Sequence, residues 1–79
     1  MRYESLPYER IRNLRIDADL TQEKVAQMLD IKQNTYSQYE IGVSRYPLEA
    51  LIKLATFYNT SIDYLVGLTD NPTPYERKL

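Results

Sequence analysis

Four hydrogen-bonding side chains gather in residues 33–38, and they are the residues of this sequence best suited to act on a partner. These residues are Gln33, Asn34, Ser37 and Gln38. At about 100° per residue they fall between roughly 0° and 140° around a helix axis, whereas Tyr36 and Tyr39 fall near 300° and 240°. Amides and hydroxyls can bond groups that both donate and accept, such as base edges in the DNA major groove. A merely solvated helix face is the alternative interpretation.

The residue inventory argues against an enzyme or a metalloprotein. The 79 residues include no histidine and no cysteine, which removes the commonest general base and the commonest metal ligands. Two glycines leave no glycine-rich phosphate loop. We therefore predict no enzyme activity, no catalytic residues, no metal and no cofactor.

Charge and hydropathy predict a soluble, cytoplasmic protein without a membrane partner. No apolar run approaches the roughly 18 to 20 residues that a membrane span needs, and none resembles a signal peptide. The net charge is −1, so any role on nucleic acid must rest on local charge. Residues 32–46 supply such charge, with Lys32 and Arg45 against one acid, Glu40.

Periodicity and end signals predict an all-α fold. Pro7 suits the first turn of a helix over residues 7–18, in which Ile11, Leu14 and Ala18 recur at helical spacing. Thr21 is the expected N-cap of a second helix, which ends before Asp30. The apolar stripe of this second helix consists of Val25, Ala26 and Leu29, with Met28 at its edge.

Three further helices are predicted over residues 32–41, 48–58 and 62–68. Gly42 would end the first of them, and Ser61 would cap the last. The inward positions expected in the last two helices are Leu48, Leu51, Leu54, Ala55, Ile62 and Leu65. Residues 1–68 would form one domain, and residues 69–79 an extension that is either flexible or contributes to dimerisation.

The sequence resembles the phage repressor and Cro class of helix-turn-helix regulators, a bacterial family also called XRE-type. The resemblance rests on "LTQEKVAQML", "NTYSQYEIG", Pro47, "LIKLA" and "SIDYLVG", and it runs from Ile11 to Gly67. It implies a compact five-helix, repressor-like domain whose second and third helices form the helix-turn-helix. The implied function is sequence-specific binding of a double-stranded DNA operator by a transcriptional regulator, specifically a repressor. The alternative is a protein-interaction module, such as an antitoxin or an accessory regulatory factor.

The resemblance also implies roles for individual residues. Gln33, Asn34 and Gln38 would read base edges, with Ser37 beside them. Phosphate contacts are implied for Gln22, Lys32, Ser44 and Arg45. Arg15 and Glu40 would form a structural ion pair, either partly buried or exposed at the surface, where such a pair contributes about 0–1 kcal/mol.

Members of this family usually bind DNA as homodimers. The dimer contact implied here involves Ile62, Tyr64, Val66 and Leu68, although Val66 and Leu68 could instead close the core. The sequence departs from the family pattern at Lys32, at Asp30 and at Ile41, where a polar residue is common.

Eight tyrosines allow two interpretations. Aromatic side chains can stack on single-stranded bases. Core packing with the hydroxyl reaching the surface is expected instead for Tyr36, Tyr39, Tyr58 and Tyr64. Tyr46 would either touch the DNA backbone or cover its loop.

Overall fold

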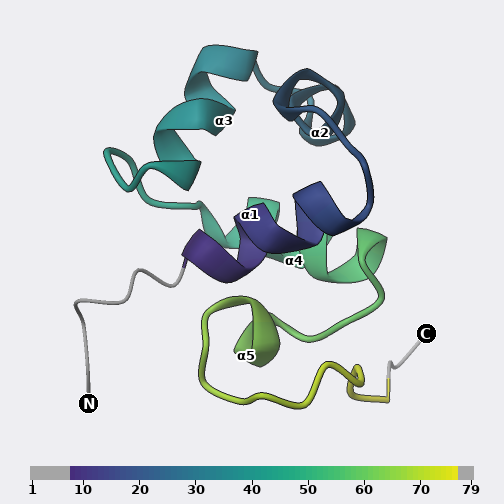
Figure 1. The fold of residues 1–79 in the computed structure, drawn as a ribbon. Coiled ribbons are helices and arrows are strands. Elements are labelled where there is room, and N and C mark those ends of the chain that lie inside the picture. The colour runs from purple at the N-terminus through teal and green to yellow at the C-terminus, as the bar shows by residue number, and fades with distance from the viewer. Residues whose placement is uncertain (1–7, 77–79) are drawn as a thin grey trace.

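The computed structural model describes residues 8–76, which form five helices and no strand. The helices are α1 (Tyr8–Asp17), α2 (Gln22–Leu29), α3 (Gln33–Glu40), α4 (Leu48–Phe57) and α5 (Ile62–Leu65). In Figure 1, α2 and α3 lie at one end of the molecule, α1 and α4 in the middle, and α5 with the following segment at the other end. The predicted all-α class is confirmed. The first seven residues of the predicted domain, including Pro7, and the last three of the extension lie outside the described residues.

Local signals explain where the helices begin. The Thr21 hydroxyl accepts a hydrogen bond from the Lys24 amide at 3.0 Å, and the Ser61 hydroxyl accepts one from the Tyr64 amide at the same distance. Both are the N-caps predicted from the sequence. Lys32 precedes α3 with extended backbone but supplies no side-chain cap.

Several helical boundaries differ from the predicted ones, and α3 is one residue shorter at each end than the predicted range of 32–41. Ala18 lies past the end of α1 and is exposed, because Asp19 takes a left-handed conformation (φ 58°) and turns the chain away. The helix over residues 62–68 ends already at Leu65, before Gly67 with its φ of 84°. Phe57 is the last residue of α4, so the predicted range was one residue too long there.

The prediction that Leu48 points inward was wrong, since its exposed fraction is 66%. Leu48 lies about 120° around the axis from the fully buried Leu54, whereas Ala50 lies within about 40° of it. Ala50, Leu54 and Ala55 are buried in α4 and Leu51 partly so, which defines the inward face.

The core contains buried side chains from all five helices. Its largest fully buried side chains are Tyr36, Ile11, Leu54, Leu65 and Val25. The chain has no cysteine to add a disulfide. Hydrophobic burial and a few buried polar contacts must therefore hold a domain that is small by the usual standard.

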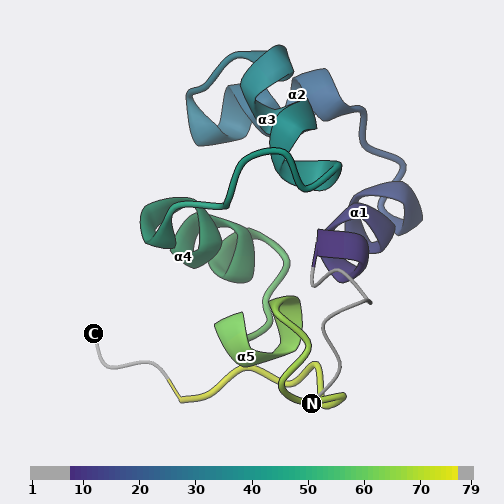
Figure 2. The same cartoon turned by 90° about the vertical axis from the view of Figure 1, so that its left-hand side faces the viewer.

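The described part of the extension, residues 69–76, runs past α5 and is tied to the domain at several points (Figures 1 and 2). Arg10 donates to the Thr69 carbonyl at 2.6 Å and to the Asp70 carboxylate at 3.0 Å. The Thr60 hydroxyl donates to the Pro72 carbonyl, and the Tyr75 hydroxyl donates to Asp63, both at 2.7 Å. This segment therefore lies against the domain.

The turn between α2 and α3 supplies a test of backbone strain. Asp30 caps α2 in a left-handed conformation (φ 60°, ψ 44°), and the following Ile31 amide bonds the Ala26 carbonyl at 3.0 Å. A β-carbon makes this conformation costly for alanine, while aspartate tolerates it better and glycine adopts it freely. We expect the Asp30→Gly variant to have a free energy of unfolding about 1 kcal/mol higher than that of the Asp30→Ala variant. Urea unfolding of both variants measures this, and equal stabilities would show that the turn is unstrained.

Within residues 8–76, no helix is both long and apolar enough to cross a membrane.

Candidate nucleic-acid interface

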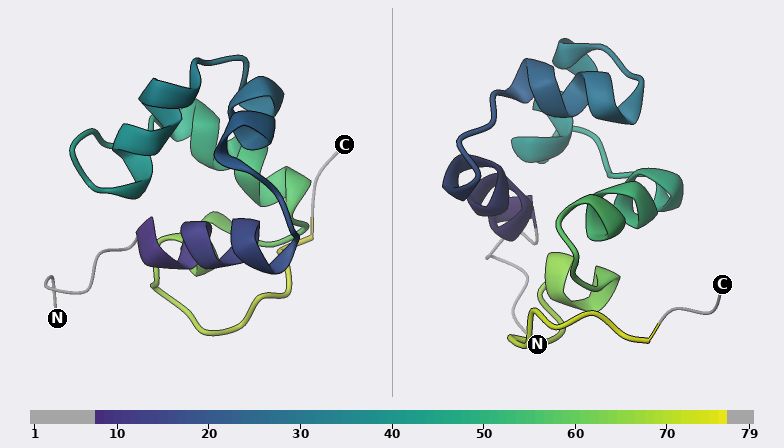
Figure 3. Two further views of the ribbon diagram at one scale, coloured as in Figure 1. Left: turned by 45° about the horizontal axis from the view of Figure 1, so that its top comes forward. Right: turned by 90° about the vertical axis from the view of Figure 1, so that its right-hand side faces the viewer.

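The four residues of the predicted reading face lie together on α3, and we call them the polar strip. Gln33, Asn34 and Gln38 are exposed and Ser37 is half-buried. The two views of Figure 3 show α3 at the periphery beside α2, away from α5 and the segment after it. The side chains of the strip are therefore available to an external partner.

Aromatic packing holds the opposite side of α3. Tyr36 has an exposed fraction of 0%, and Tyr39 and Tyr46 are also buried. The ring of Tyr46 meets that of Tyr36 edge-on at 6.3 Å and that of Tyr39 at 5.0 Å, measured between centroids. Such ring pairs add to the stability gained by burial alone. The tyrosines thus fix the rotation of α3 that exposes the polar strip.

Two sequence expectations about the tyrosines were wrong. Contact of Tyr46 with the DNA backbone is ruled out, because its ring is buried in the core against Tyr36 and Tyr39. The hydroxyls of Tyr36 and Tyr58 are buried and do not reach the surface. Burial raises the pKa of Tyr58 to about 12 and that of Tyr36 further, so both hydroxyls stay protonated near neutral pH.

The ion pair between Arg15 and Glu40 is present in its partly buried form. The Arg15 Nε donates to Glu40 Oε2 at 2.7 Å and its Nη2 donates to Oε1 at 3.1 Å. The exposed fractions of the two side chains are 13% and 2%. Burial alone would raise the pKa of Glu40, but hydrogen bonds from Arg15, Tyr36 and Gln22 together with the charge of Arg15 outweigh it and hold that pKa below its ordinary value. The paired carboxylate therefore stays charged inside the domain and ties α1 to α3.

A chain of hydrogen bonds runs from this ion pair to the polar strip. The Gln22 Nε2 donates to Glu40 Oε1 at 3.0 Å, and Gln22 Oε1 accepts from Gln33 Nε2 at 3.5 Å. The sequence did not predict these contacts, although Gln22 and Gln33 both occupy the first position of their helices. The half-buried Gln22, expected only to touch phosphate, thus also orients the first amide of the strip.

The other predicted phosphate-binding residues lie at both ends of α3. Lys32 and Arg45 are exposed, and Ser44 is half-buried with its hydroxyl donating to Gln38 Oε1 at 3.3 Å. The amides of Val43 and Ser44 both bond the Gln38 carbonyl, at 3.0 and 3.1 Å, and fix the loop that carries Arg45. With Glu40 buried by the ion pair, residues 32–46 present two exposed cations, Lys32 and Arg45, and no exposed acid.

The four predicted dimer residues lie at the other end of the molecule. Ile62, Tyr64 and Val66 are half-buried and Leu68 is exposed. The Arg10 guanidinium stacks 4.2 Å above the Tyr64 ring and also donates to the Tyr64 carbonyl at 2.9 Å. No sequence signal pointed to this contact, because Arg10 and Tyr64 are 54 residues apart.

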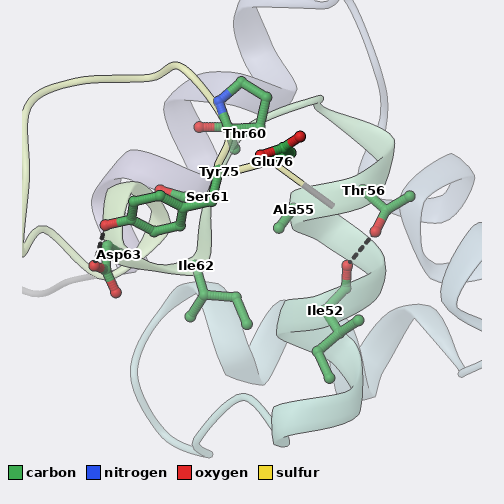
Figure 4. A pocket seen from close by; sticks show the side chains of 10 residues that line it. Ile52, Ala55, Thr56, Thr60, Ser61, Ile62, Asp63, Tyr75 and Glu76 are labelled. Carbon is green, nitrogen blue, oxygen red and sulfur yellow. Dashed lines mark hydrogen bonds between the residues drawn. The ribbon is translucent and has the colours of Figure 1, made fainter. Parts of the chain in front are cut away.

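A shallow pocket lies between α4, α5 and the final described segment (Figure 4). Ile52 and Ile62 provide apolar lining, and Tyr75 lies at one side of the pocket with its hydroxyl donating to Asp63. None of its lining residues belongs to the polar strip, and α5 with the segment after it lies at the opposite end of the molecule from α3 (Figures 1 and 2).

Comparison with known proteins identifies a matching family and proteins of similar sequence. The model of a family described as helix-turn-helix matches residues 11–65. The uncharacterized HTH-type transcriptional regulator YobD of Bacillus subtilis (strain 168) is 42% identical over 71 residues, which are 89% of this chain and 63% of YobD. The cryptic phage CTXphi transcriptional repressor RstR of Vibrio cholerae is 43% identical over 70 residues, 89% of this chain and 61% of RstR. The chain thus spans about three fifths of the length of these two relatives.

A solved structure matches the fold as well. The P22 c2 repressor, crystallised in complex with a synthetic operator, superimposes with a TM-score of 0.71 at 29% identity. The match covers 78% of this chain and 94% of the repressor chain.

Proposed function

Since this chain belongs to the helix-turn-helix family, we propose that it is a sequence-specific double-stranded DNA-binding transcriptional regulator that acts as a repressor. The observation that carries the proposal is the exposed polar strip on α3, backed by buried tyrosines and by the Arg15–Glu40 ion pair. Two relatives support it, since RstR is named a repressor and the P22 c2 repressor is bound to an operator.

In the proposed complex α3 enters the major groove and α2 crosses the DNA backbone. Gln33, Asn34 and Gln38 hydrogen bond base edges, with Ser37 beside them. Amides pair most naturally with adenine, whose N6 and N7 present one donor and one acceptor. Gln22, Lys32, Ser44 and Arg45 contact phosphates and set the register of α3 in the groove.

The proposal includes a homodimer on a two-fold symmetric operator, with half-sites about one helical turn apart. Ile62, Tyr64, Val66 and Leu68 are the residues we assign to the subunit contact. The exposed Leu68 and the half-buried Val66 favour this role over closure of the core, because neither is fully covered within one chain.

Selection of bound duplexes from a random pool tests the proposal, since it reports binding, symmetry and half-site spacing together. We expect enrichment of a two-fold symmetric sequence. A protein-interaction module would be favoured instead by three results together. The selection would recover no preferred sequence, a single protein would co-purify with the chain, and duplex binding would not weaken as salt rises.

Gln33→Ala is expected to weaken binding to the selected operator by about 1–3 kcal/mol and to relax preference at one base position. The reason is that Gln33 stands at the start of α3, where base contacts are made, and its amide is oriented by Gln22. Titration of the variant against the operator and its single-base changes measures both effects. Equal weakening on every duplex would remove Gln33 from the base-reading set.

Arg45→Ala is the matched comparison for this experiment, because Arg45 is exposed and is assigned to phosphate. Its loss should weaken all duplexes alike and lower the slope of log affinity against log salt by about one unit.

A further inference from the structure

One exposed residue next to the polar strip is apolar. Ile41 follows α3 directly, has an exposed fraction of 62%, and its amide donates to the Ser37 carbonyl at 3.1 Å. Its backbone is still helical (φ −88°, ψ 0°). Residues four apart on a helix lie on the same face, so Ile41 extends the polar strip by one turn beyond Ser37.

We propose, on the basis of the proposed function, that Ile41 is a specificity-determining residue whose side chain contacts the 5-methyl group of a thymine. The thymine methyl is the one apolar group that the base pairs present in the major groove, and apolar side chains recognise it by contact. Cytosine in the same place presents no methyl group. Ile41 therefore complements the amides of the strip, which bond the polar edges of the bases.

The residues around Ile41 leave its side chain accessible to a binding partner. The neighbouring Glu40 carboxylate is buried and bound by Arg15 and Gln22, so it does not compete for the same space or repel the DNA. Gln38 is held by the Ser44 hydroxyl at 3.3 Å, which keeps the adjacent amide in place. The loop that follows is pinned by two amide bonds to the Gln38 carbonyl.

Val43 provides an internal comparison. It is apolar and 70% exposed, much like Ile41, but it lies beyond Gly42, whose φ of 84° ends the helical path. Val43 is therefore off the face that carries Ser37, and we assign no base to it.

Replacement of single thymines by uracil in the selected operator tests the inference, because this change removes only the methyl group. At one thymine position in each half-site, a single replacement by uracil should lower the affinity of the wild-type protein about four-fold, the value expected for the burial of one methyl group. Ile41→Ala should bind the thymine and uracil duplexes equally at that position, while Val43→Ala should keep the wild-type discrimination. Thermal unfolding should be nearly unchanged in both variants, since both side chains are exposed.

Two results would overturn the inference while leaving the proposed function intact. One is that no thymine-to-uracil change alters the affinity of the wild-type protein, which would mean that the Ile41 side chain contacts a sugar or solvent and not a thymine methyl group. The other is that Ile41→Ala retains the full methyl discrimination. Failure of the wild-type protein to select any duplex would overturn the proposed function itself, and the inference with it.

Discussion

Replacing Arg15 with alanine is expected to destabilise the domain by about 3–5 kcal/mol, the range found when one member of a buried ion pair is removed. The Glu40 side chain is only 2% exposed and would be left charged without its principal donor. Arg15 also donates to the Leu20 carbonyl at 2.9 Å, which helps to close the turn between α1 and α2. Because small domains are typically stable by about 5–15 kcal/mol, the variant should be partly unfolded on mild heating.

Denaturant unfolding measures this effect, and Arg12→Ala is its matched control. Arg12 stands on the same helix but is exposed, so its removal should change the unfolding free energy by less than about 0.5 kcal/mol. Similar losses in the two variants would mean that the ion pair contributes no more than a surface charge does.

The stability lost in Arg15→Ala should depend on pH. In the wild-type protein the pKa of Glu40 lies below its ordinary value of 4.5, so its contribution is present above that value and is lost as the pH falls through the lowered pKa. Without Arg15, burial favours the neutral acid, which protonates more readily in the variant. The difference in unfolding free energy should therefore be largest near pH 7 and shrink in acid. A difference that does not change between pH 7 and pH 3 would contradict this account.

The features that the sequence predicted are those set by neighbouring residues. The Thr21 and Ser61 caps and the end of α2 before Asp30 each depend on groups within a few positions. The exposure of the polar strip likewise follows from periodicity along α3, since its residues and the tyrosines lie on opposite sides of one helix.

The features that the sequence did not predict depend on contacts between distant segments. Tyr46 stands in a loop, where no periodicity distinguishes a buried side chain from an exposed one, and only the rings of Tyr36 and Tyr39 place it in the core. Arg10 meets Thr69 and Asp70 across the fold, which explains why residues 69–76 lie against the domain although their composition resembles a free extension. The error at Leu48 has a different cause, because the inward face of α4 is centred on Leu54 and Leu48 lies about 120° around the helix axis from it.

Tyr36→Ala is expected to cost about 3–5 kcal/mol of unfolding free energy, as truncation of a large buried aromatic residue does. Tyr36 is fully buried and contacts Tyr46, so its loss opens a cavity directly behind the polar strip. Tyr36→Phe is the matched control, since it keeps the ring and should cost no more than about 1.5 kcal/mol. Urea unfolding compares the two, and equal losses would assign the stability to the hydroxyl instead of the ring.

The same pair of variants separates the stability of the domain from the geometry of the strip. If the tyrosine rings fix the rotation of α3, Tyr36→Ala should bind the operator more weakly even at a temperature where the variant remains folded, because Gln33, Asn34 and Gln38 would no longer be held at one depth in the groove. Tyr36→Phe should bind as the wild-type protein does. Affinity titrations at low temperature, with circular dichroism to establish the folded fraction, provide the measurement. Wild-type affinity in folded Tyr36→Ala would mean that the DNA itself, and not the aromatic core, orients α3.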